Sequence, residues 1–88
     1  SHVPHLVAAG LAASLDPRDL RWAGTGFRDT TRIAAGDPEL WTAIPRENRE
    51  QVRVGLAEVV AKLRQFDAAL ATDDAAAMMR LLAEGQTL

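Results

Sequence analysis

The chain has 88 residues, contains no cysteine and carries a formal net charge of −2 at pH 7. A chain of this length forms at most one small domain, and without cysteine it has neither disulfides nor cysteine-ligated zinc. Its acidic balance excludes a general attraction for nucleic acid or anionic membranes, so any anion-binding site must be local. No apolar run approaches the roughly 18 residues that a membrane span requires.

Helix signals dominate the sequence, and no stretch alternates apolar and polar residues as a half-buried strand does. We therefore predict an all-α fold of about five helices, one of them long. The first helix is expected over about residues 3–15, with Pro4 in its first turn, where the missing N–H has no partner to lose. Residues 18–26 are expected to connect it to a second helix, which begins near Phe27 and ends with Gly36 as its C′ residue.

Asp37-Pro38-Glu39 is a strong helix start, because it combines an N-cap, a proline tolerated at the first position and an acid in the first turn. Pro45 lacks the N–H that would continue this helix, which is therefore expected to stop near Ile44. A long helix over about residues 46–71 should follow, because apolar residues recur there at three- and four-residue steps.

The long helix and the last helix carry further local signals. Glu58 precedes Lys62 by four residues, the favourable order for an ion pair on a helix. Thr72-Asp73-Asp74 is expected to cap the last helix, and Gly85 to end it. A rod of about 25 residues is roughly 38 Å long, so we expect one end of it to pack on something outside this chain.

Arg28, Asp29 and Arg32 form the group best suited to bind an anion. Two arginines four residues apart on one helix face repel each other unless an anion lies beside them, and the planar guanidinium group suits a carboxylate. Asp29 can orient Arg32, the two threonines between them add hydroxyl donors, and Gly24 and Gly26 allow close approach of a ligand. From spacing alone, a solvated helix face with one internal ion pair explains the same residues.

The histidines and tryptophans allow more than one interpretation. His2 and His5 are three residues apart, but no acidic third metal ligand is near them in sequence. An imidazole that donates to a ligand carboxylate is one reading, and a capping or satisfied surface histidine is another. Trp22 and Trp41 are, as single residues, more often part of a core than of a ligand-binding wall.

Four sequence runs together resemble a known family. Ser-His-Val-Pro-His begins the chain, Gly-Thr-Gly-Phe-Arg-Asp-Thr-Thr-Arg-Ile-Ala-Ala covers residues 24–35, Asp-Pro-Glu-Leu-Trp covers residues 37–41, and Asn48-Arg49 follows. In this order they are similar to the C-terminal domain of prephenate dehydrogenases, and the resemblance extends over nearly the whole chain. It implies a single helical dimerisation domain over residues 1–88, similar to the C-terminal helical bundles of the 6-phosphogluconate dehydrogenase type.

The resemblance also implies an activity for the complete enzyme. Members of the family oxidatively decarboxylate prephenate to 4-hydroxyphenylpyruvate with NAD or NADP, in tyrosine biosynthesis. The active site lies in the cleft between the helical domain and a preceding Rossmann domain, which holds the cofactor and the principal catalytic histidine. We therefore expect this chain to be part of a longer cytoplasmic enzyme, a homodimer that is inactive as this fragment alone and binds neither nucleic acid nor membrane.

By the same resemblance, five residues of this chain would contact or support the substrate. Arg32 would bind a substrate carboxylate, and Asp29 would hold Arg32 and an interface network in place. His5 would donate a hydrogen bond to the substrate, with His2 as a nearby support. Trp41 would line or close the pocket. The resemblance places no catalytic residue, cofactor ligand or metal ligand in this chain.

The sequence departs from the family pattern at two places, and other interpretations stay open. Pro45 interrupts a region expected to be continuous helix, and the connector between Leu15 and Gly24 is short. Arogenate is an alternative substrate. A helical oligomerisation module without a ligand site would explain the long helix equally well, whereas a DNA-binding helix-turn-helix is disfavoured by the acidic charge.

Overall fold

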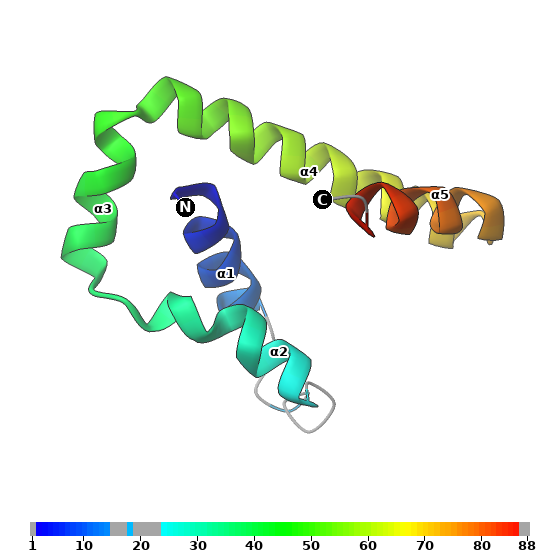
Figure 1. The fold of residues 1–88 in the computed structure, drawn as a ribbon, viewed down its shortest axis with the longest axis horizontal. Coiled ribbons are helices and arrows are strands. Elements are labelled where there is room, and N and C mark those ends of the chain that lie inside the picture. The colour runs from blue at the N-terminus through cyan, green and yellow to red at the C-terminus, as the bar shows by residue number, and fades with distance from the viewer. Residues whose placement is uncertain (1, 15–17, 19–23, 87–88) are drawn as a thin grey trace. The chain divides into compact units, whose positions relative to one another are not determined.

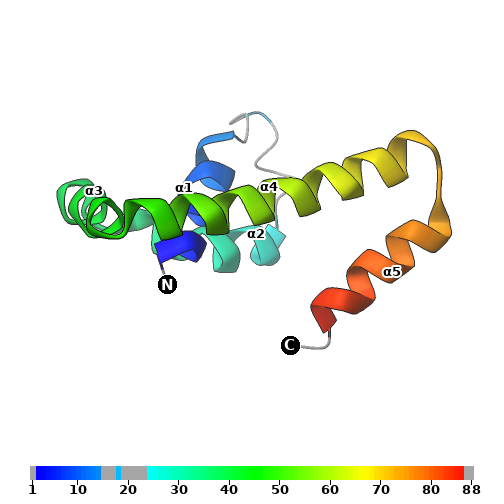
Figure 2. The same cartoon turned by 90° about the horizontal axis from the view of Figure 1, so that it is seen from above.

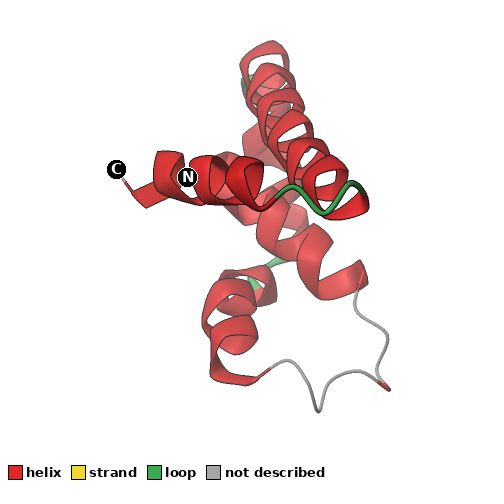
Figure 3. Ribbon diagram, turned by 90° about the vertical axis from the view of Figure 1, so that its right-hand side faces the viewer, coloured by secondary structure: helices red, strands yellow, loops and turns green. Residues whose placement is uncertain are grey.

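A computed structural model describes residues 2–14, 18 and 24–86 of the chain. Every regular element in this described part is helical and no strand occurs in it, as Figure 3 shows, so the predicted all-α fold class is confirmed. The elements in chain order (Figure 1) are α1 (His2–Ser14), α2 (Gly24–Thr31), the 3₁₀ helix η2 (Arg32–Ala35), α3 (Pro38–Glu47), α4 (Arg49–Ala71) and α5 (Ala75–Gln86). None of these helices is both long enough and apolar enough to cross a bilayer.

The chain divides into two compact units, Ser1–Arg53 and Val54–Leu88. The boundary falls inside α4, so the first turn of that helix belongs to the first unit and the rest to the second. The expectation that residues 1–88 act as a single domain stays a prediction.

The first unit is built around α1. This helix packs against α2 and η2, which follow each other without a break. Ala8 on α1 and Val52 on the first turn of α4 are buried apolar residues of this unit, and the imidazole of His5 is buried with 7% of its surface exposed. His5 is thus a buried polar side chain beside the apolar residues of this small core.

The second helix differs from its prediction at both ends. It begins at Gly24 rather than near Phe27, so Gly24 and Gly26 belong to a helix and not to a connector. Its α-helical geometry ends at Thr31, where φ is −95° and ψ is 0°, and the next turn is 3₁₀. Arg32 therefore opens a tighter turn, whereas Arg28 lies on α2, and the expected placement of both guanidinium groups on one face stays a prediction. Such 3₁₀ turns are frequent at the C-terminal ends of α-helices, and this one packs against α1.

The start of α3 is as predicted, but its end is not. The side chain of Asp37 accepts a hydrogen bond from the Glu39 N–H at 3.1 Å, with Pro38 at the first helical position. Pro45 lies inside the helix, which continues to Glu47 instead of stopping near Ile44. Pro45 is only two residues before the end of α3, so its missing N–H removes a backbone hydrogen bond late in the helix and the last turn still forms. The break comes at Asn48, whose N–H donates to the Pro45 carbonyl at 3.2 Å.

The second unit is a helical hairpin formed by the remainder of α4 and by α5 (Figure 2). The connecting turn contains Asp73 in the left-handed region, with φ of 51°. Asp74 caps α5 as predicted, because its carboxylate accepts a hydrogen bond from the Ala77 N–H at 3.0 Å. Ala69 and Leu81 are the buried residues that join the two helices of this unit. The last helix continues to Gln86, one residue past the predicted end at Gly85.

One ion pair of this hairpin corrects the prediction for Lys62. Its ammonium Nζ lies 2.7 Å from Glu84 Oε2 on α5, not beside Glu58 one turn earlier on α4. The hydrogen bond and the charge of Lys62 lower the pKa of the Glu84 carboxyl below its ordinary value. Glu58 lies on the same exposed helix as Lys62, whereas Glu84 lies on the other helix of the hairpin. Residue spacing along one helix cannot reveal a contact of the second kind.

Candidate functional site

A ring stack between α1 and α3 is the centre of the candidate site. The imidazole of His5 lies against the indole of Trp41 with ring centroids 3.7 Å apart and ring planes 12° from parallel. The two residues are 36 positions apart, so the stack ties the start of the first helix to the short third helix. Aromatic pairs of this kind contribute about 0.5–1.5 kcal/mol beyond their area of burial. Their more important effect here is to fix the plane of a buried imidazole.

Gly36 lies beside this stack, in the link between η2 and α3. It ends η2, as predicted, and its N–H donates to the Ile33 carbonyl at 3.3 Å. Its backbone is extended, with φ of −65° and ψ of 163°, and not left-handed as expected for a C′ glycine. The atoms nearest to the vacant side-chain position are on Trp41 and His5. The missing side chain of Gly36 therefore allows the two rings to lie close to its backbone, whereas its backbone angles are ordinary.

Arg32 lies on the turn that packs against α1, the helix that carries His5. Its side chain is exposed, and so are those of Arg28 and Asp29 on α2. Within the described part of the chain, none of these three side chains forms a salt bridge. The expected ion pair between Asp29 and Arg32 is thus not formed in this structure. An exposed guanidinium that no carboxylate of this part of the chain neutralises is chemically available to an external anion.

Thr30 and Thr31 were expected to add hydroxyl donors for a ligand, and the structure uses them differently. The Thr30 hydroxyl donates to the Gly26 carbonyl and the Thr31 hydroxyl to the Phe27 carbonyl, both at 2.8 Å. Each bond satisfies a carbonyl four residues earlier in α2, a common arrangement for threonine within a helix. Because these residues form a helix, each threonine hydroxyl lies close to a carbonyl of its own helix and donates to it instead of to a ligand.

The remaining candidates lie elsewhere. His2 is half-buried in the first turn of α1, where it lines a shallow cleft with Asn48 and Gln51. In the described ranges, no three histidine or acidic side chains gather as possible metal ligands. Trp22 lies outside the described residues, as does most of the connector between α1 and α2.

His5 and Trp41 are separate candidates in the sequence, and their stack was not predicted. Gly36 was predicted only as a helix terminator. The signal for the stack was present in the family resemblance, which named both rings for the same pocket. The role of Gly36 had no such signal, because the contact depends on three segments meeting in space.

These features define a helical domain that presents a buried, stacked imidazole and an exposed arginine on neighbouring elements. Comparison with known proteins gives the family. The chain belongs to the family described as "Prephenate dehydrogenase, dimerization domain", whose model matches residues 1–84. The resemblance recognised in the sequence is thereby confirmed.

Two relatives illustrate the extent of the similarity. The chain is 30% identical over 93 residues to the cyclohexadienyl dehydrogenase of Zymomonas mobilis, an alignment that covers 98% of this chain and 32% of the relative. It is 33% identical over 86 residues to the prephenate dehydrogenase of Bacillus subtilis, with 91% of this chain and 23% of the relative covered. The chain thus spans about a third or less of the relatives' length.

Proposed function

We propose that this chain is the substrate-binding and dimerisation part of an NAD- or NADP-dependent prephenate dehydrogenase. The observation that carries the proposal is the state of Arg32. It ends the Phe27–Arg32 run typical of the family, lies exposed on the turn that packs against α1, and has no ion-pair partner within the described part. Burial of Arg32 in a salt-bridge network made by the protein would favour the module without a ligand site, and the exposed Arg32 forms no such network within the described part.

The proposed site complements the charge of the substrate. Prephenate carries two carboxylates, and a guanidinium group binds a carboxylate through two parallel hydrogen bonds. The imidazole of His5, held in its plane by Trp41, supplies a further hydrogen bond whose direction is fixed before the substrate arrives. Such pre-organisation lowers the entropic cost of orienting a substrate. In this proposal Asp29 and His2 support the site from the neighbouring turns.

We propose no nucleotide-binding residues in this chain. The described elements are all helical, whereas the Gly-rich phosphate loop of dinucleotide-binding domains joins a strand to a helix. We therefore assign NAD or NADP, and the proton transfer at the substrate hydroxyl, to a preceding domain of the full-length enzyme. When bound there, the cofactor would supply the hydride acceptor for the oxidative decarboxylation. This chain would position the substrate for that step, and a cytoplasmic location stays a prediction.

The test uses the full-length enzyme with prephenate. Arg32→Ala should raise KM about tenfold to a hundredfold, because a hydrogen bond to a charged group contributes about 1.5–3 kcal/mol. Arg32→Lys should recover only part of the affinity, since an ammonium group cannot reproduce the planar fork. Arg28→Ala is the matched control, a second exposed arginine of the same run, and should change KM less than about threefold. An unchanged KM in Arg32→Ala, or equal effects at both positions, would refute the assigned role.

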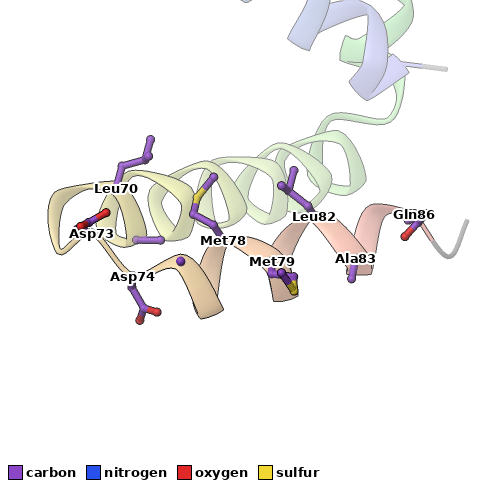
Figure 4. A pocket seen from close by; sticks show the side chains of 10 residues that line it. Leu70, Asp73, Asp74, Met78, Met79, Leu82, Ala83 and Gln86 are labelled. Carbon is purple, nitrogen blue, oxygen red and sulfur yellow. The ribbon is translucent and has the colours of Figure 1, made fainter.

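The same proposal includes a homodimer, supported by the apolar surface of the second unit. Leu70 on α4 and Met79 and Leu82 on α5 are 68%, 74% and 60% exposed. They line an open groove of about 620 Å³ between the two helices, together with Met78 (Figure 4). Large apolar side chains gathered on one face of a soluble protein typically mark an interface. The family description names dimerisation as the role of this domain.

Sedimentation of the full-length protein tests this part of the proposal. Met79→Glu places a charge in the groove and should shift the protein from dimer to monomer at micromolar concentration, because a buried unpaired charge costs several kcal/mol. Gln65→Glu adds the same charge at an exposed position of α4 that does not line the groove, and should leave the dimer intact. A dimer that persists in Met79→Glu would exclude this groove from the interface.

A further inference from the structure

We infer that Gly36 is a positioning residue of the substrate site, and that its missing side chain is what lets the imidazole of His5 lie flat against the indole of Trp41. The inference rests on the proposed function, in which both rings face the substrate. It assigns a role to a residue that touches neither substrate nor cofactor and acts only through the two rings.

The space around Gly36 is too small for any side chain. A Cβ atom built there would lie 2.8 Å from Nε1 and 2.9 Å from Cδ1 of Trp41, and 3.0 Å from Cε1 of His5. Nonbonded carbon atoms pack favourably at about 3.5–4.0 Å. Even alanine, the smallest replacement, would thus overlap the indole and press on the imidazole at the same time.

The backbone of Gly36 does not itself require glycine. Its φ of −65° and ψ of 163° lie in the extended region that every residue can adopt. Gly10 and Gly26, by comparison, lie in helices where an added Cβ would meet nothing within 4 Å. Gly36 is therefore set apart from these two glycines by the rings beside it, and the need for it is steric.

The rings, and not the backbone, would yield to a substitution. The Gly36 N–H is bonded to Ile33 at the end of η2, and the next residue, Asp37, caps α3 and accepts a hydrogen bond from the Trp41 N–H at 3.0 Å. The chain is thus held on both sides of Gly36. The indole, by contrast, turns about two side-chain torsions, so an added methyl group would rotate it away from His5. The fold would survive, while the plane of the imidazole would no longer be fixed.

Two measurements on the full-length enzyme test the inference. In the wild type, the indole at 3.7 Å should shift the ring protons of His5 upfield, which NMR of histidine-labelled protein detects, with His5→Gln for assignment. Gly36→Ala should remove this shift. It should also raise KM for prephenate about five- to tenfold, equivalent to one weakened hydrogen bond of about 1 kcal/mol, and change kcat less. Gly10→Ala is the control and should alter neither the shift nor KM.

A double substitution separates a steric role from a general structural one. Trp41→Leu removes the ring atoms nearest to the added methyl group, so Gly36→Ala should add less than about a twofold change in KM to that variant. The inference would be overturned if the effects of the two substitutions on KM multiplied. It would also be overturned if the Gly36→Ala enzyme kept the upfield shift and the KM of the wild type.

Folding outcomes are informative as well. If Gly36→Ala does not fold but the double variant does, the clash with Trp41 is the cause and the inference stands. If neither folds, glycine serves the backbone and the inference is wrong. The NMR shift is measured without substrate, so it tests the steric role of Gly36 independently of the proposed function. If Gly36→Ala loses the stack while Arg32→Ala leaves KM unchanged, the proposed function is refuted and the steric role of Gly36 stands.

Discussion

The N-cap of α3 gives the sharpest quantitative prediction, because this helix carries Trp41. Asp37→Ala removes the carboxylate oxygen that accepts the Glu39 N–H at 3.1 Å. Loss of such a cap costs about 1 kcal/mol, and a change of this size increases the population of the opened helix roughly fivefold, since 1.4 kcal/mol corresponds to a factor of ten. The amides of α3 should therefore exchange with solvent about five times faster.

Hydrogen exchange of the full-length protein, followed by mass spectrometry, measures this effect segment by segment. Asp37→Asn keeps a capping oxygen but removes the charge, and should retain most of the protection. Asp74→Ala removes the equivalent cap of α5, where the Ala77 N–H is bonded at 3.0 Å. It should accelerate exchange in α5 and leave α3 unchanged. Equal acceleration of α3 by Asp37→Asn and Asp37→Ala would refute capping as the cause and indicate that charge dominates.

Three further predictions concern packing, titration and backbone. Leu81→Ala should lower the free energy of unfolding by about 2–5 kcal/mol, because Leu81 is buried. The amides of α5 should then exchange faster, and exchange rates like those of the wild type would contradict this prediction. Lys62→Met should raise the pKa of the Glu84 carboxyl toward its ordinary value near 4.5, measured by NMR titration. Since folding lowers this pKa, the stabilisation by the pair is present above pH 4.5 and is lost as pH falls through the folded pKa; an unchanged midpoint would exclude Lys62 as the cause. Pro45→Ala should slow exchange in the last turn of α3, because it restores a helical N–H and relieves a cost of up to about 3 kcal/mol; faster exchange there would show that the proline ring stabilises this turn by packing.

The sequence by itself determined the features that depend on a few neighbouring residues. The capping of α3 by Asp37 and of α5 by Asp74 follows from short-range hydrogen bonds between a side chain and the next turn, and both formed as predicted. The all-α class followed from helical periodicity and the absence of strand patterns. The ordered motifs, including the run that ends at Arg32, were sufficient to recognise the family.

Only the tertiary structure decided the contacts between distant segments. Lys62 pairs with Glu84 across a hairpin instead of with its helical neighbour. His5 and Trp41 were known as separate candidates, but their stack, and the steric need for Gly36 beside it, exist only once α1, η2 and α3 come together. The physical reason is that a helix start depends on atoms a few bonds apart, whereas ring stacking and close approach depend on where packing places whole helices.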